Sequence, residues 1–485
     1  MKIGRSVAIT RRQFFSGMLG AGALAAGASV ALPGCQKKDS TTELIEAVAT
    51  HAPNARVYYL DVSKDQIVAS ADAAEAEAGD YLRERASFDL PLGCLLYQNS
   101  EDFALVVRSR AGMSDVEETG GAASASGGAG SGSGGSGGSD ANAGGRDSAS
   151  GSDGGSNSSF GSEASSGTGG SSGSSPLVSL SLLNLQDGSL SSLLDNALGA
   201  AEDFVIYDAR ANNEILIWVE CHLTSGEWRV HAAPLLAGKR GTAALLDEGG
   251  LLYEPPMLCV CAQSAYWTVM PNPDGSASFE DSLLKRARLT GTGADASVGE
   301  PEQVYVSHGR MITNPQSSDG VLTFVPRVDV SAVFYQLTAL HDDTGEIDEV
   351  AILPPALRVS DAVFGPSGFS FQIELGYDYA KGLSRYGTYE QMPDGRYFFA
   401  NKTPSSPTAS VGGCLYLKST KNIIGFDVAN NRFFVVGTPK DCVEYGDILA
   451  GSGAHQTLVT YTTITNKISA DKSTTRVRVL EPVTL

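Results

Sequence analysis

Cysteine, histidine and tryptophan are scarce in this chain. Its 485 residues include seven Cys, six His and three Trp. Small scaffolds held together by disulfides carry many closely spaced cysteines, and so few over this length exclude that class. Cys259 and Cys261 are not followed by a second Cys or His pair at the spacing of a zinc site, so no metal site is predicted.

Catalytic and cofactor signatures are also missing. Outside a Gly/Ser-rich tract the sequence has no Gly-x-Ser-x-Gly elbow, Walker loop, Rossmann Gly-x-Gly-x-x-Gly after a strand, or His-Glu-x-x-His. It also lacks a haem Cys-x-x-Cys-His and an iron–sulfur cysteine run. His222 and His231 flank a hairpin turn, but two histidines without a third ligand are weak for a metal. We predict no catalytic residues and no cofactor.

Basic residues are also few, and no apolar run is long. There are 35 basic against 55 acidic residues, a formal charge of −20, which argues against nucleic acid and against a basic membrane patch. The acidity is interpreted as a solubility feature. The apolar run Met18 to Leu32 has fifteen residues, fewer than the roughly 20 that a membrane-spanning helix needs.

The N-terminus has the composition of an export signal. Lys2, Arg5, Arg11 and Arg12 form a positive region, and an uncharged run rich in Ala, Gly and Leu follows at Met18 to Leu32. Its length and its glycines make it a poor permanent anchor. We predict that this segment is removed.

The same region resembles the twin-arginine (Tat) signal, whose pattern is Ser/Thr-Arg-Arg-x-Phe-Leu-Lys. Thr10, Arg11, Arg12 and Phe14 match, whereas the next two residues depart from Leu and Lys. The resemblance implies export of the chain in a folded state. The alternative is an ordinary secretory signal that contains two arginines.

Leu32-Pro33-Gly34-Cys35 is similar to the bacterial lipobox, with Pro33 where Ala or Ser is usual. The resemblance implies that Cys35 becomes the first mature residue and carries acyl chains, several of which hold a protein firmly at a membrane. The predicted location is therefore extracytoplasmic, anchored to the outer face of the cell membrane. The alternative is an idle cysteine after a signal peptide.

Composition divides the chain into four parts. Residues 1–35 form the signal segment, and residues 36–118 hold several strands, interpreted as a first blade with a helical insertion at Ala71 to Arg85. Residues 119–175 are nearly all Gly, Ser, Ala and Asp and cannot build a core, which predicts disorder. Residues 176–485 form the main domain.

The main domain is predicted to be mainly all-β. The segment Ser189 to Ala201 is amphipathic, with Leu190, Leu193, Leu194 and Leu198 at helical spacing on one face. After it, short strands alternate with turns such as Pro273-Asp274-Gly275 and Pro393-Asp394-Gly395. A loose unit of roughly 50 to 60 residues recurs, with an apolar strand, a turn and a second strand carrying an aromatic residue. This pattern resembles a β-propeller of six or seven blades with short helical insertions. Neither WD40 nor kelch signatures are present.

Four features are candidates for a site or a cross-link. Residues 253–256 (Tyr-Glu-Pro-Pro) and the tyrosines of residues 377–389 are interpreted either as the lining of a propeller mouth or as blade packing. The acidic segment 342–348 lacks calcium-loop spacing and predicts a solvated hairpin turn. Cys414 and Cys442 are the candidate disulfide.

Two classes of function are consistent with these patterns. The first is a membrane-anchored, surface-displayed binding or scaffold protein for a protein, peptide or glycan ligand, with no nucleic acid partner. The second is a redox accessory protein that takes up a cofactor before export, or an extracytoplasmic propeller enzyme. The missing catalytic motifs favour the first.

Overall fold

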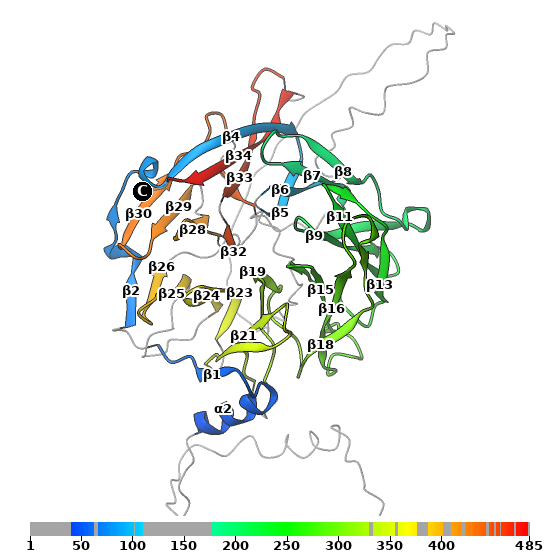
Figure 1. The fold of residues 1–485 in the computed structure, drawn as a ribbon, viewed down its shortest axis with the longest axis vertical. Coiled ribbons are helices and arrows are strands. Elements are labelled where there is room, and N and C mark those ends of the chain that lie inside the picture. Colours follow the sequence, from blue (N-terminus) through cyan, green and yellow to red (C-terminus); the bar gives the residue numbers. More distant parts are fainter. Residues whose placement is uncertain are drawn as a thin grey trace, which may run out of the picture. The chain divides into compact units, whose positions relative to one another are not determined.

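The computed structural model of the chain (Figure 1) describes residues 40–62, 66–100, 102–109, 177–328, 333–354, 357–375, 387–400, 409–418, 422–442, 446–450, 453–455, 457–469 and 472–483. The chain divides into two units, residues 1–44 and residues 45–485. Only the start of helix α2 (Ser40–His51) belongs to the described part of the first unit. All of the described strands belong to the second unit.

The second unit is a seven-bladed β-propeller whose blades follow one another along the chain. Figure 1 shows β5, β19 and β23 toward the middle and β8, β13 and β18 on the outside. Blade 1 consists of β5 (Cys94–Asn99), β6 (Phe103–Ser109), β7 (Leu177–Asn184) and β8 (Leu190–Leu194). Blade 2 consists of β9 (Phe204–Ala211), β10 (Ile215–His222), β11 (Trp228–Leu236) and β13 (Ala244–Gly249), with β12 (Lys239–Arg240) beside β11. Blade 3 consists of β14 (Leu258–Cys261), β15 (Ser264–Val269), β16 (Ser282–Thr290) and β18 (Glu302–Ser307), with β17 (Ser297–Val298) beside β16.

The remaining blades have the same four-strand plan. Blade 4 consists of β19 (Gln316–Ser318), β20 (Val321–Phe324), β21 (Gln336–His341) and β22 (Ile347–Ile352), and blade 5 of β23 (Arg358–Gly365), β24 (Gly368–Leu375), β25 (Gly387–Gln391) and β26 (Tyr397–Ala400). Blade 6 consists of β27 (Ala409–Val411), β28 (Cys414–Lys418), β29 (Ile423–Asp427) and β30 (Arg432–Val436), with β32 (Gly453–His455) beside β27. Blade 7 consists of β31 (Ile448–Leu449), β33 (Leu458–Ile464), β34 (Thr474–Pro482) and β4 (Leu82–Pro91).

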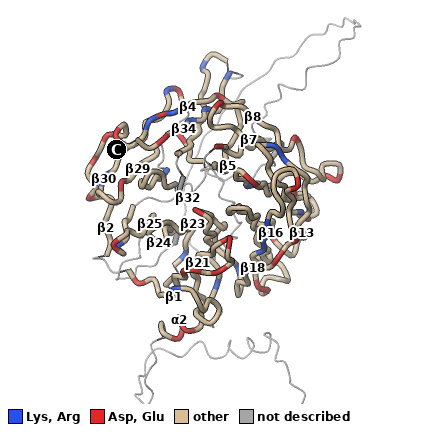
Figure 2. Tube along the Cα trace, viewed as in Figure 1, with Lys and Arg blue, Asp and Glu red and all other residues tan. Residues whose placement is uncertain are grey.

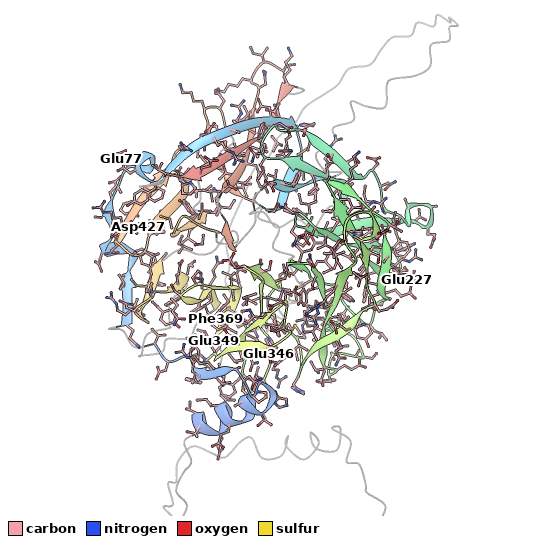
Figure 3. The ribbon with its side chains drawn as sticks, viewed as in Figure 1. Glu77, Glu227, Glu346, Glu349, Phe369 and Asp427 are labelled. Atoms are coloured by element: carbon pink, nitrogen blue, oxygen red, sulfur yellow. The ribbon has the colours of Figure 1, made fainter. Side chains whose placement is uncertain are left out.

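Seven hydrophobic clusters lie at the seven interfaces between successive blades, the last joining blade 7 to blade 1. Strand β10 shows why its sequence is apolar at consecutive positions: Leu216 and Trp218 face blade 1, while Ile217 and Val219 face blade 3. Successive side chains of a strand point to opposite faces, and here both faces are buried. Phe369 (Figure 3) is fully buried between blades 4 and 5. The predicted all-β propeller is confirmed, with seven blades.

The ring is closed by pairing β4, the fourth strand of the described chain, with its last strand, β34. Strand β4 runs antiparallel to β34 over nine residue pairs, from Leu82↔Pro482 to Pro91↔Thr474. Arg476 and Arg478 of β34 form ion pairs with Asp89 and Glu84 of β4. Residues of both charge signs are interspersed along the ring (Figure 2).

Before β4, the N-terminal residues run along the outside of three other blades. Strand β1 (Arg56–Tyr59) pairs in parallel with β22, β2 (Ile67–Ala69) with β26, and β3 (Ala74–Glu75) with β30. We call residues 56–91 the N-terminal belt. It adds an outer strand to blades 4, 5 and 6 and supplies the outer strand of blade 7.

Two segments predicted to be helical are not α-helices. Residues 71–85 contain β3, the short 3₁₀ helices η2 (Ser70–Asp72) and η3 (Ala78–Asp80), and the start of β4. The reason is that the backbone N–H groups of Ala74 and Ala76 donate to the carbonyls of Asn431 and Phe433 in blade 6. Strand addition therefore outweighs the helix propensity of alanine.

The second segment, residues 189–201, holds β8 and the start of the 3₁₀ helix η6 (Ala200–Glu202). Leu193 and Leu194 are buried against blade 2, whereas Leu190 and Leu198 are exposed, so the four leucines do not share one face. The helical spacing of the leucines is misleading here, because the consecutive residues Leu193 and Leu194 at the end of β8 are both buried between blades 1 and 2. A further 3₁₀ helix, η7 (Gly293–Asp295), connects β16 to β17.

Candidate functional site

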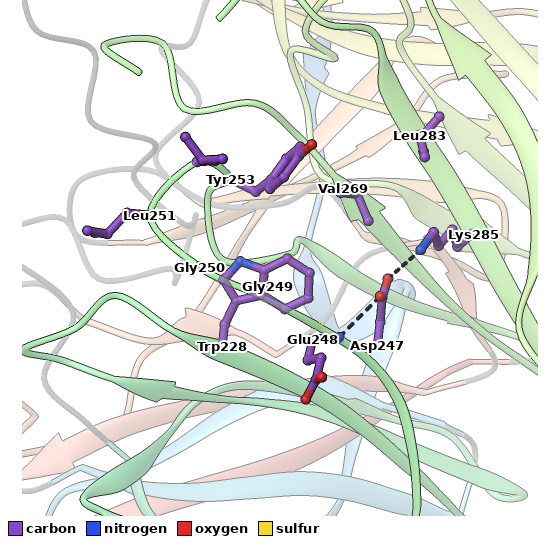
Figure 4. Close-up of a pocket in the computed structure, with 11 residues that line it drawn as sticks. Trp228, Asp247, Glu248, Gly249, Gly250, Leu251, Tyr253, Val269, Leu283 and Lys285 are labelled. Atoms are coloured by element: carbon purple, nitrogen blue, oxygen red, sulfur yellow. Dashed lines mark hydrogen bonds and ion pairs between the residues drawn. The ribbon is translucent and has the colours of Figure 1, made fainter. Parts of the chain in front are cut away.

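A pocket of about 420 Å³ lies between blades 2 and 3, beside the end of the outer strand β13 (Figure 4). Strands β11, β13, β15 and β16 contribute to it, together with the loop that follows β13. Its lining residues are Trp228, Asp247, Glu248, Gly249, Gly250, Leu251, Leu252, Tyr253, Val269, Leu283 and Lys285. We call this the Trp228 pocket.

Trp228 is held rigidly in the wall of the pocket. Its side chain is 1% exposed, and a Cβ atom built on Gly249 would lie only 2.3 Å from an indole carbon. Any larger residue at position 249 would therefore displace the ring. The indole N–H is buried and has no hydrogen-bond partner among the described residues. An unpaired buried donor is uncommon and costs stability, which is one mark of a site kept for a purpose other than packing.

The polar end of the pocket is an ion pair between Asp247 and Lys285. Asp247 Oδ2 accepts from Lys285 Nζ at 2.8 Å and from the indole N–H of the buried Trp267 at 2.8 Å. Both charged side chains are mostly buried, with 16% and 26% exposed. The carboxylate therefore has its partners already and is fixed in place.

The outer rim is apolar. Leu251 is 70% exposed and Leu252 is half exposed. Leu251 rests on the hairpin turn between β10 and β11, where a Cβ on Gly226 would lie 2.3 Å from Leu251 Cδ2 and where the φ of Gly226 is +71°. Only glycine suits that backbone and that contact. Leu223 of the same turn and Phe279 are also exposed.

Acidic groups surround the apolar rim. Glu227, Glu248 and Glu280 are exposed, and Figure 3 shows Glu227 on the outside of the ring. Tyr253 donates its phenol hydrogen to Glu280 Oε2 at 2.9 Å, and this hydrogen bond raises the pKa of Tyr253. The site thus offers exposed leucines framed by carboxylates, with the basic Lys285 already neutralised by Asp247.

A second pocket of about 250 Å³ lies between α2 and the outer strand β18 of blade 3. The rings of His51 and His308, which both line it, are 6.2 Å apart, and His308 Nδ1 lies 3.6 Å from an Asp281 oxygen. Within the described residues no group of three or more His, Cys, Asp or Glu side chains is arranged to hold a metal ion.

The predicted signal residues Arg11, Arg12 and Phe14 and the predicted lipidation site Cys35 lie outside the described residues, so their roles stay predictions. None of the described helices is long and apolar enough to cross a membrane.

The cysteines in the described part of the chain are free thiols, including the candidate pair Cys414 and Cys442. Burial raises the pKa of Cys221, Cys259 and Cys414 to about 12. These thiols stay protonated at neutral pH and are poor nucleophiles.

Two predicted segments can be placed. Tyr253 does line a pocket, while the adjacent Glu254 is buried and pairs with Arg310 at 2.6 Å. Tyr389 is fully buried and stacks on Phe371, which supports the packing interpretation for that residue. The tyrosines of residues 377–386 lie outside the described residues.

The acidic segment 342–348 forms the predicted hairpin turn, between β21 and β22. It is not wholly solvated, because Asp342 is buried and accepts the phenol hydrogen of Tyr266 at 2.7 Å. His222 and His231 do not face each other across the β10–β11 hairpin, since the strand partner of His231 is Trp218.

Sequence reasoning missed Trp228, Leu251 and the Asp247–Lys285 pair. A signal was present at residues 249–252, Gly-Gly-Leu-Leu, where two leucines follow a glycine pair at a turn and have no strand to bury them. The pairing of Asp247 with Lys285 joins residues of different blades, and no local pattern indicates it.

No protein-family model matches the sequence, and no curated protein matches it. Among solved structures, a prolyl endopeptidase is 14% identical with a TM-score of 0.39, covering 64% of this chain and 47% of its own. Polysaccharide lyase Uly1 is 10% identical with a TM-score of 0.38, covering 63% and 85%. The β-propeller domain of the Trilobed protease from Pyrococcus furiosus is 12% identical with a TM-score of 0.36, covering 59% and 84%. This chain thus spans about half the length of the prolyl endopeptidase, and none of these values supports a transfer of function.

Proposed function

We propose that this chain is a binding protein displayed on the outer face of the cell membrane, and that it holds a segment of a partner protein at the Trp228 pocket. The observation that carries the proposal is an exposed, preorganised apolar rim around a pocket in which Asp247 and Lys285 are already paired with each other. The scaffold is the seven-bladed ring, which fixes the pocket between two blades.

The rim favours binding because its leucine side chains are exposed and yet have little conformational freedom to lose. Leu251 is held against Gly226, so little conformational freedom is lost when a ligand covers it. Contiguous exposed apolar groups rimmed by polar residues are typical of interaction sites. Burying one leucine side chain contributes roughly 1.5–3 kcal/mol.

The pocket favours binding over catalysis. A general base must be free to take a proton, whereas Asp247 is occupied by Lys285 and by Trp267. No Ser, Cys or His side chain is among the residues that line the pocket.

A protein segment suits the pocket better than a glycan does. A sugar presents many hydroxyl groups that require hydrogen-bond partners when they are buried. The side chains of Asp247, Tyr253 and Lys285 are already bonded within the protein, and the exposed rim is made of leucine.

Display at the membrane is supported by the sequence alone. Arg11, Arg12 and Phe14 resemble a signal for folded export, and Cys35 resembles a lipidation site. A binding site between blades would then face the extracytoplasmic space, held at the surface by the acyl chains.

The proposal is tested by site-specific photo-crosslinking in cells that normally make the protein. We expect p-benzoylphenylalanine in place of Leu251 to give one discrete adduct whose partner is identified by mass spectrometry. The matched control is the same substitution at Ile468, an exposed apolar residue of blade 7. Equal labelling from both positions, or none from either, contradicts the proposal.

A further inference from the structure

The side-chain acceptors at the polar end of the Trp228 pocket are occupied. Asp247 is the carboxylate there, and its Oδ1 accepts from the backbone N–H of Glu248 at 3.1 Å. Its Oδ2 accepts from Lys285 and from the indole of Trp267, each at 2.8 Å. A ligand N–H or O–H that reached Asp247 would have to displace one of these partners, so this end of the pocket disfavours a ligand that brings donors.

Two carbonyls of the loop that follows β13 are occupied as well. Gly250 O accepts from the backbone N–H of Tyr253, and Leu252 O accepts from that of Asn272, each at 2.9 Å. Gly250 and Leu252 both line the pocket. These backbone acceptors are therefore satisfied within the protein and do not require a ligand donor.

Donors, in contrast, are in excess. An ammonium group has three N–H donors, and that of Lys285 has one hydrogen-bond partner, Asp247, within the described part of the chain. Lys285 is 26% exposed, so its other donors are open to a ligand. The buried indole N–H of Trp228 is a further donor without a partner among the described residues. A ligand that fits this pocket therefore brings acceptors and few donors.

The acceptor should be neutral. Lys285 and Asp247 neutralise each other, and the whole chain carries a formal charge of −20. Glu280, which accepts the phenol hydrogen of Tyr253, adds an exposed carboxylate at the rim. A ligand carboxylate or phosphate would be repelled, whereas a carbonyl oxygen accepts from the ammonium group without that cost.

We infer that the Trp228 pocket takes a proline of the partner segment in the polyproline II conformation, and that the carbonyl preceding the proline accepts from Lys285 Nζ. Proline has no backbone N–H and brings an apolar ring. A polyproline II segment makes no internal hydrogen bonds, so its carbonyls are available as acceptors. This inference rests on the proposed function and adds to it the chemistry of the segment that is bound.

The walls of the pocket suit a proline ring. Tyr253, Val269 and Leu283 line it (Figure 4), and Leu251 is exposed at its rim. Proline-rich segments dock in grooves lined by aromatic side chains, and a preformed polyproline II helix has little conformational entropy to lose. A sugar matches the pocket less well, because each of its hydroxyl groups brings a donor together with an acceptor.

The test titrates the full chain with a capped, fluorescently labelled peptide of alternating alanine and proline, followed by fluorescence anisotropy. In a second peptide alanine replaces every proline, which restores the N–H donors and removes the polyproline II preference. The proline peptide should bind, and the all-alanine peptide should bind about ten-fold or more weakly. No binding of the proline peptide at about 1 mM overturns the inference, as does equal affinity of the two peptides. Tighter binding of a peptide of alternating alanine and glutamate overturns it too.

The tryptophans report where the peptide binds. The chain has three, so isotope-labelled indole groups give three N–H signals in a nuclear magnetic resonance spectrum. Trp228 lines the pocket, and the indole of Trp267 donates to Asp247. Trp218 is the internal control, because it donates to Glu220 between blades 1 and 2. The proline peptide should shift the signals of Trp228 and Trp267 and leave that of Trp218 in place. Any other pattern overturns the inference.

Substitutions test the donor. Lys285→Met removes the ammonium group and keeps an apolar stem, and it should weaken binding of the proline peptide about ten-fold or more. Because this change takes the counter-charge from Asp247, a second variant combines it with Asp247→Asn, which keeps an acceptor for Trp267 and should bind equally weakly. Lys239→Met, at an exposed position of β12, is the matched control and should have no effect. Unchanged affinity in the folded double variant overturns the inference.

The two proposals fail in different ways. A specific adduct at Leu251 on a partner segment without proline, together with no binding of the proline peptide, leaves the binding function in place and removes proline recognition. Peptide binding that depends on Lys285 and shifts the Trp228 signal supports proline recognition directly. Absence of the Leu251 adduct removes the binding function itself.

Discussion

The strand pair that closes the ring is stabilised by Arg478, and its contribution can be measured as a change in the melting temperature. Arg478 of β34 donates from Nη1 to Asp447 Oδ2 at 2.7 Å and from Nε to Glu84 Oε2 at 2.9 Å. Asp447 is 1% exposed, and its other carboxylate oxygen has no partner among the described residues. Replacing Arg478 by Met keeps the aliphatic stem and removes the direct ion pair of the buried Asp447, which then keeps only the hydrogen bond from Thr460 and the weaker attraction of Lys418.

The expected loss is large because of Asp447. Removing one partner of a buried ion pair costs about 3–5 kcal/mol, whereas the exposed contact with Glu84 contributes about 0–1 kcal/mol. At about 2 °C per kcal/mol for a large domain, the melting temperature should fall by about 6–10 °C. Arg478→Met combined with Asp447→Asn should recover much of this loss, because the second change removes the uncompensated charge.

Arg476 is the matched control on the same strand. It binds Asp89 through two hydrogen bonds of 2.7 Å, a geometry at least as good as that of Arg478. Both of its groups are about one-third to one-half exposed, so Arg476→Met should cost only about 0–1 kcal/mol. Thermal unfolding followed by circular dichroism separates the two variants. Equal losses for Arg476→Met and Arg478→Met would refute the reasoning that burial decides the size of the effect.

The loss at Arg478 should also depend on pH. Burial raises the pKa of Asp447, and Arg478 opposes that rise, so the pKa of Asp447 rises further in Arg478→Met. A carboxyl group whose folded pKa exceeds its unfolded value destabilises the fold above the folded pKa, where it is charged in both states. This cost disappears as pH falls through the raised pKa toward the ordinary Asp value of about 3.9. The difference from wild type should therefore shrink on acidification.

The other predictions concern targeting and the Gly/Ser-rich tract. Replacing Arg11 and Arg12 by Lys should leave the precursor in the cytoplasm, and cell fractionation that shows normal export would sink the Tat assignment. Cys35→Ala should release the mature chain from membranes, whereas continued sedimentation with membranes would refute the anchor. Deleting residues 119–175 should raise the free energy of unfolding by only about 1–2 kcal/mol, because it shortens the connection between the paired strands β6 and β7. A loss of several kcal/mol in chemical denaturation would show that the tract is ordered.

The all-β character and the propeller could be predicted from sequence because each blade carries its own evidence. Runs such as Ile215 to Val219 are apolar throughout, which is typical of strands covered on both faces, and turn residues separate them. The sequence did not distinguish six blades from seven. The repeat is loose, and blade 7 takes its outer strand from residues nearly four hundred positions away.

Local propensity failed where distant backbone groups decided the structure. Residues 71–85 are rich in Ala and Glu, but their hydrogen-bond partners lie in blade 6 and near the end of the chain. The candidate site could not be predicted from the sequence for a similar reason. Tyr253 stood out as an aromatic residue at a turn, whereas Trp228 and Lys285 belong to ordinary-looking strands and meet only when blades 2 and 3 pack together.

The N-terminal belt also constrains the order in which the protein can fold during synthesis. Tyr58 leaves the ribosome 291 residues before Glu349, its hydrogen-bond partner, and Arg83 leaves it 398 residues before Glu481. Strands β1, β2 and β3 therefore find their partners only when blades 4, 5 and 6 have been made, and β4 finds its partner only when the last strand, β34, exists. Contacts so distant in sequence are slow to form. A nascent chain of this design carries four strands without partners until blade 4 has been made, and the last of them until β34 is complete, which makes late maturation, and protection until then, part of its architecture.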